Sequence, residues 1–280
     1  MINRDIIDVL NFREDISPFL VHLTKDGPID ESPNKQTSKE ALEKIIENQE
    51  LVCAKCLLTR RDKNGNEIGK YNMSVARFGM YTRNMDDEKQ RQLFSAISFT
   101  ETPLNEIQSL IDIKGRNVDL RQYGLVFHKN KLADKGVGPV LYLNNTNKNN
   151  KDELIYKLCK ILITECDGEH EDVAKELFPM ISVFGNQITP YGKNGTKLKN
   201  YDFLWEREWR YPYAKGHLKF DRDDLFIGLC PDNEIDKFEE LANTCKLKDL
   251  KFVDPYRNLK YYAKKLITER KNAGIEASVV

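Results

Sequence analysis

The chain has 280 residues, enough for one large domain or two small ones. Its 44 Lys and Arg residues equal its 44 Asp and Glu residues, so no overall positive field draws it to nucleic acid or to a membrane surface. No apolar run reaches the roughly 18 residues that a bilayer span needs, and the first residues lack the order of a signal peptide. We therefore expect a cytoplasmic protein whose six cysteines stay reduced.

A short buried strand is predicted at residues 18–24, where an apolar run follows a proline. His22 lies inside this run and Thr24 ends it. A lone histidine in an apolar strand is more often a core residue with a satisfied ring than a catalytic group. The polar pair at the strand end nevertheless makes His22 a candidate catalytic residue and Thr24 a candidate substrate contact.

A loop and a helix follow this strand. Residues 25–36 are rich in Asp, Pro, Asn and Gly, which favours a loop. Thr37 and Glu40 have the spacing of a capping box, so we predict a helix that starts there and ends near Asn48. Further on, the Asn-Gly pair within residues 60–66 is typical of a hairpin turn.

A second strand is predicted at residues 94–100 and brings two polar residues to the start of a helix. Thr102 and Pro103 suit the N-cap and first position of that helix. A helix N-terminus favours an anion because its N–H groups are unpaired and its dipole is positive there. Thr100 and Glu101 are therefore candidate substrate contacts, although Glu101 could satisfy those donors itself.

The middle of the chain predicts two more strands, at residues 123–128 and 138–143, around a helical turn that Gly136 stops. Tyr123 opens the first of them. Helices are predicted at 153–166, 171–184, 233–244 and 258–271. Strands are predicted at 225–230 and 250–253, and a polar loop at 185–200.

These elements predict a single α+β domain over residues 1–280. Its helices would interrupt a mixed, mostly antiparallel central sheet.

The most informative motif is Y-D-F-L-W-E-R-E-W-R-Y-P-Y at residues 201–213. If residues 205–211 are extended, side chains alternate between two faces, with Glu206, Glu208 and Arg210 on the polar one. The aromatic face is predicted to be buried. Charges on an interior strand need partners or a function, so the polar face is a candidate site. An ordinary ion pair between Arg210 and a glutamate is the alternative.

Four motifs in this order resemble the AbiGi family of bacterial phage-resistance proteins. They are H-L-T at 22–24, S-F-T-E-T-P-L at 98–104, Y-G-L-V-F-H-K at 123–129 with G-V-G-P-V-L-Y at 136–142, and E-R-E-W-R at 206–210. The resemblance covers about residues 15–230, and residues 231–280 add a C-terminal strand and helices. It implies a role in abortive infection as the antitoxin partner of a toxin.

The order of His22, Tyr123 and Glu206 or Glu208 is more distantly similar to ADP-ribosyltransferases of the diphtheria-toxin type. That resemblance implies an NAD cofactor, with the histidine on its ribose, the tyrosine stacked on nicotinamide, and a glutamate that stabilises developing positive charge. Of the two glutamates, Glu208 is the better candidate, because it lies between Glu206 and Arg210 on the polar face and its geometry would be better fixed. Arg210 would then orient a phosphate or pair with a glutamate. No metal is expected.

Two functions stay open at this point. The first is an anti-phage enzyme of ADP-ribosyltransferase type, with protein or nucleic acid as its target. The alternative is a non-catalytic antitoxin or sensor that binds a toxin or phage protein. The basic helix at 258–271 spreads its cations without an aromatic platform, so a solvated surface is favoured there over nucleic-acid binding. No membrane contact is expected.

Overall fold

The computed structural model describes most of the chain. The described residues are 17–26, 36–53, 57–61, 67–72, 87–112, 120–145, 157, 171–189, 197–201 and 204–257. The helices predicted at 153–166 and 258–271 lie outside them, apart from Lys157. Most of the loop predicted at 25–36 lies outside them as well.

The chain divides into two compact units. Unit 1 comprises Met1–Gln49, Glu101–Lys131 and Phe220–Val280. Unit 2 comprises Glu50–Thr100 and Leu132–Lys219. The division into compact units does not test whether residues 1–280 form a single domain, and the single domain stays a prediction.

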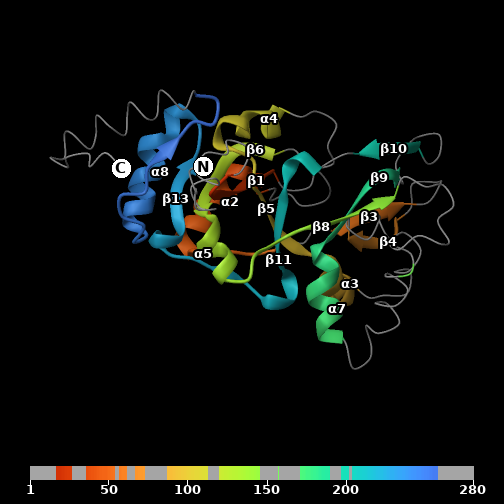
Figure 1. The fold of residues 1–280 in the computed structure, drawn as a ribbon. Coiled ribbons are helices and arrows are strands. Elements are labelled where there is room, and N and C mark those ends of the chain that lie inside the picture. The colour runs from red at the N-terminus through yellow and green to blue at the C-terminus, as the bar shows by residue number, and fades with distance from the viewer. Residues whose placement is uncertain are drawn as a thin grey trace, which may run out of the picture. The chain divides into compact units, whose positions relative to one another are not determined.

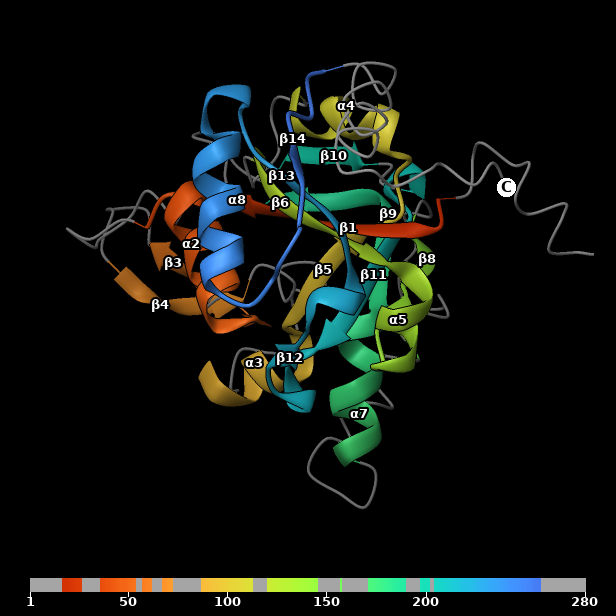
Figure 2. The same cartoon turned by 90° about the vertical axis from the view of Figure 1, so that its left-hand side faces the viewer.

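Unit 1 contains strands in the order β14-β13-β6-β1. Figure 1 labels β13, β6 and β1, and Figure 2 labels β14 as well. Their bounds are Phe19–Lys25 for β1, Leu120–His128 for β6, Leu225–Leu229 for β13 and Phe252–Val253 for β14. The β1–β6 and β6–β13 pairs are antiparallel, whereas β13 and β14 are parallel. The sheet is thus mixed and mostly antiparallel, and the predicted α+β class is confirmed.

Helices cover both faces of this sheet. Helix α4 (Ile107–Asp112) packs on the face that carries Val21 and Val126. The opposite face meets α2 (Ser38–Asn48) and α8 (Ile235–Thr244), which lie side by side in Figure 2. The predicted helices at these places are confirmed, and each buries one apolar stripe in the core of unit 1.

Unit 2 contains several small sets of strands. The first has the order β5-β11-β7, with bounds Ala96–Thr100, Glu208–Pro212 and Gly138–Pro139. The second has the order β10-β9-β8, with bounds Lys197–Tyr201, Ile181–Thr189 and Leu141–Asn145. The described part of unit 2 also has two strand pairs: β3 with β4 (Leu57–Arg61, Glu67–Asn72) and β2 with β12 (Glu50–Leu51, Leu218–Lys219).

Among the described residues of unit 2, helices α3 (Asp87–Phe94) and α7 (Glu171–Leu177) lie wholly within the unit. Helix α5 (Lys129–Asp134) carries the chain from unit 1 into unit 2, and Gly136 follows it at φ 92°, as the sequence predicts for a left-handed stop. The strand predicted at 138–143 is split into β7 and β8. The break lies at Val140, whose N–H donates to the carbonyl of Glu208 at 2.9 Å.

The helix predicted at 171–184 is wrong in its second half. Helix α7 ends at Leu177, a 3-10 turn covers Phe178–Met180, and β9 then runs to Thr189. Pro179 lacks an amide hydrogen and cannot continue an α-helix. The predicted polar loop at 185–200 is also wrong at both ends, because β9 and β10 pair there with Gly185 opposite Tyr201.

Candidate functional site

The residues predicted as a site are divided between the two units. His22, Thr24, Glu101 and Tyr123 belong to unit 1. The others, Thr100, Glu206, Glu208 and Arg210, belong to unit 2. Each group has its own geometry within its own unit.

His22 and Tyr123 share one face of the sheet in unit 1. His22 pairs with Leu125 across the β1–β6 ladder, and Tyr123 precedes Leu125 by two positions on β6. Both side chains therefore lie on the face that meets α2 and α8. The Tyr123 ring packs against Phe238 with 5.9 Å between ring centroids.

The hydroxyl of Tyr123 is already bound within unit 1. It donates to Glu234 at 3.2 Å, and the Lys39 ammonium lies 2.6 Å from the other oxygen of that carboxylate, outside hydrogen-bond geometry. The Lys39–Glu234 contact is therefore ionic. Burial, together with the negative charge of Glu234, raises the pKa of Tyr123 to about 12. The phenol is protonated at neutral pH and acts as a donor.

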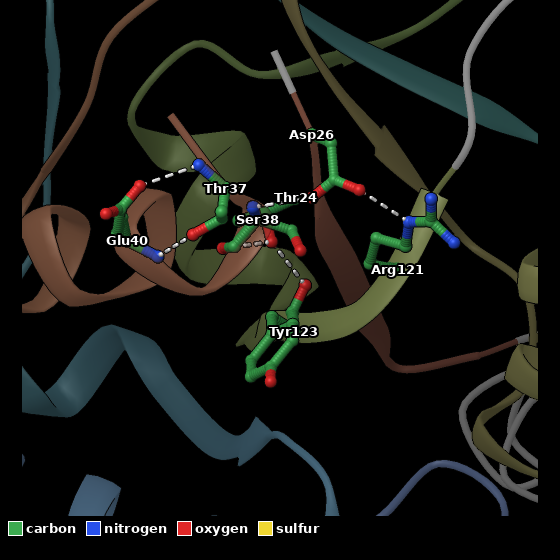
Figure 3. Close-up of polar contacts among 7 residues, drawn as sticks. All are labelled: Thr24, Asp26, Thr37, Ser38, Glu40, Arg121 and Tyr123. Atoms are coloured by element: carbon green, nitrogen blue, oxygen red, sulfur yellow. Dashed lines mark hydrogen bonds and ion pairs between the residues drawn. The ribbon is translucent and has the colours of Figure 1, made fainter. Parts of the chain in front are cut away.

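Thr24 ties strands β1 and β6 to the start of α2 (Figure 3). Its buried hydroxyl lies 2.8 Å from the carbonyl of Ser38 and 3.0 Å from the carbonyl of Tyr123, and it shares its one proton between them. The residue that the sequence offered as a substrate contact thus makes internal contacts. We call Thr24, Ser38, Asp26 and Arg121 the strand–helix junction.

Asp26 completes this junction. Its carboxylate accepts from the Ser38 N–H at 2.9 Å and from Arg121 at 2.9 Å, as Figure 3 shows. Burial acts to raise the pKa of Asp26, but the hydrogen bonds from Ser38 and the charge of Arg121 lower it below its ordinary value. Beside it, the capping box of Thr37 and Glu40 is present as predicted.

Glu101 is bound by a lysine. Its carboxylate lies 2.9 Å from the Lys129 ammonium, and both side chains are largely buried. The 3-10 turn Leu104–Glu106 leads into α4, and its N-cap is Pro103, without a side-chain cap. The predicted N-cap at Thr102 is therefore wrong by one residue. Pro103 takes the extended N-cap conformation, with φ −53° and ψ 144°, so Thr102 lies before the cap.

In unit 2 the predicted strand at 205–211 begins later than expected. A 3-10 turn covers Leu204–Glu206, Arg207 adopts φ 43°, and β11 starts at Glu208. The Thr100 hydroxyl donates to the carbonyl of Glu206 at 2.6 Å and fixes this turn. Glu206 consequently does not share a strand face with Glu208, which corrects the alternation inferred from the sequence.

Glu208 and Arg210 do share a face, and they bind each other. The Nε and Nη2 of Arg210 each donate to one Glu208 oxygen at 2.8 Å. Its Nη1 donates to the carbonyls of Pro179 at 2.6 Å and Ile181 at 3.0 Å. These contacts tie β11 to the start of β9. We call them the Arg210 brace.

The Arg210 brace is a buried charge pair. Arg210 is 7% exposed in its side chain, and Glu208 is 19% exposed. Burial by itself lowers the pKa of Arg210, but the charge and hydrogen bonds of Glu208 raise it above its ordinary value. The Tyr142 hydroxyl accepts from the Glu208 N–H at 3.0 Å, and burial raises the pKa of Tyr142 to about 12.

Unit 2 also contains a groove that the sequence did not indicate. It is lined by residues of α3, α7 and the turn Tyr213–Lys215, with a volume of about 510 Å³. Its polar walls include Glu88, Asp172 and Glu176. No local sequence motif marks it, because three separate segments form it.

The fold and these contacts define an α+β protein in which the predicted Thr24, Tyr123, Glu208 and Arg210 make internal bonds. A family model, described as "Putative abortive phage resistance protein AbiGi, antitoxin", matches residues 73–253. This is more than half of the chain, and the protein belongs to the AbiGi family. Its family places it in abortive phage resistance.

The matched range begins after the H-L-T motif at 22–24 and extends past residue 230. Neither the curated proteins nor the solved structures gave a match. Among the described residues, each helix is too short or too polar to cross a membrane.

Proposed function

We propose that this protein is a non-catalytic antitoxin, which binds a protein toxin and neutralises it during abortive infection. The family description supports this role. The observation that carries it is the Arg210 brace, in which both oxygens of the best catalytic candidate, Glu208, accept bonds from a buried arginine. A carboxylate that stabilises a positively charged transition state must face the substrate instead.

Freeing Glu208 for chemistry would be costly. Arg210 would keep its charge at a position that is 7% exposed in the side chain, with carbonyl oxygens as its remaining partners. Removing one member of a buried ion pair typically costs about 3–5 kcal/mol. The pair therefore supports a structural role for this face of β11, with binding rather than catalysis as the task of the protein.

The test is growth rescue in cells that express the cognate toxin that this role requires. Wild-type protein is expected to restore growth and to co-purify with the toxin. His22→Ala and Tyr123→Phe are expected to rescue equally well, because neither side chain performs chemistry in this proposal. Toxicity of this chain expressed alone, abolished by His22→Ala in a folded protein, would contradict the antitoxin role.

An ADP-ribosyltransferase with NAD as cofactor is the second candidate. It is favoured by the shared sheet face of His22 and Tyr123. The fit is partial, since the Tyr123 ring packs on Phe238 and its hydroxyl binds Glu234. Purified protein should then consume NAD and label a protein or nucleic-acid fraction, and His22→Ala should stop both while Tyr123→Phe retains the stacking ring. A folded protein that neither binds nor consumes NAD refutes this candidate.

A further inference from the structure

We draw no further inference here: the strongest candidate, the cluster of half-buried rings that Phe19, His128 and Phe226 form at one end of the sheet face that packs on α4 in unit 1, is a surface patch for which nothing among the described residues shows what covers it.

Discussion

The strand–helix junction of unit 1 and the Arg210 brace of unit 2 both hold a strand against another segment of the chain, but they do so with different chemical groups. Each ties a strand to another segment by donating to backbone carbonyls. The junction uses a neutral hydroxyl and an ion pair whose Arg121 is 50% exposed. The brace uses a charged group that is 7% exposed.

The difference lies in what happens when a partner is lost. Water can reach Asp26 and Arg121 in the junction, so that pair contributes little to stability. Water does not solvate Arg210, so its partners become obligatory. The comparison predicts that substitutions lower the free energy of unfolding by amounts that decrease from the Arg210 brace to the exposed Asp26–Arg121 pair of the junction.

The largest effect is expected for Glu208→Gln, which leaves the Arg210 charge buried beside a neutral amide. We expect a loss of about 3 kcal/mol in the free energy of unfolding, measured by urea denaturation. The double variant Glu208→Leu/Arg210→Met should recover part of this loss, because it removes both charges. It should not recover all, since the carbonyls of Pro179 and Ile181 lose their donor. A single variant as stable as the wild type would show that the brace is not obligatory.

The next effect is expected for Thr24→Val, which preserves shape and removes the hydroxyl. The buried carbonyl of Ser38 loses its 2.8 Å donor, and this should cost about 1–2 kcal/mol in urea denaturation. Thr100→Val is the matched variant in unit 2, because the Thr100 hydroxyl donates to a backbone carbonyl as well, that of Glu206 at 2.6 Å, whereas Thr24 shares its proton between two carbonyls. Thr100 is less buried than Thr24, so its loss should be the smaller of the two. The reverse order would contradict the comparison.

A smaller effect is expected for Thr37→Ala at the start of α2. The Thr37 side chain accepts from the Glu40 N–H at 3.2 Å, and its loss leaves one helix donor to water. Removal of such a cap typically costs about 1 kcal/mol. Thr37→Ser keeps the oxygen and should retain most of the stability in the same denaturation assay. Equal losses for both variants would mean that the cap is not the cause.

The elements that the sequence predicted correctly are those with local signals. The α2 capping box needs only Thr37 and Glu40, three positions apart, and α8 shows its apolar stripe within its own length. The turn at Leu204–Glu206 had no such signal. It depends on a bond from Thr100, which is 106 positions away. Local spacing cannot reveal such a partner.

The same reasoning applies to the candidate site. The two-residue spacing of Glu208 and Arg210 on one strand was enough to offer their ion pair as an alternative to catalysis. The brace is completed by the carbonyls of Pro179 and Ile181, which lie in a segment that the sequence predicted to be helical. The burial of the Glu208–Arg210 pair could therefore not be inferred from the sequence. The groove required three segments to be packed together and left no motif.

The smallest effect is expected at Asp26, and it should depend on pH. The folded pKa of Asp26 is lower than its ordinary value of 3.8, so its carboxylate stabilises the fold above about pH 4. That contribution is lost as pH falls below 4 through the folded pKa, because the unfolded chain binds the proton more readily. Asp26→Asn should therefore be less stable than the wild type at pH 7, by less than about 1 kcal/mol given the exposure of the pair.

Urea denaturation of both proteins between pH 7 and pH 3 tests this sign. The difference in stability should shrink as the pH falls, because the wild type becomes protonated at the position where the variant is already neutral. Glu40 also has a lowered pKa, but it is present in both proteins and cancels in the difference. A difference that stays constant to pH 3 would assign the effect to the altered hydrogen bonds of the amide instead of to the lost charge. The Asp26–Arg121 pair would then stabilise the junction through its hydrogen bonds, as the buried Thr24 hydroxyl does, more than through its charges.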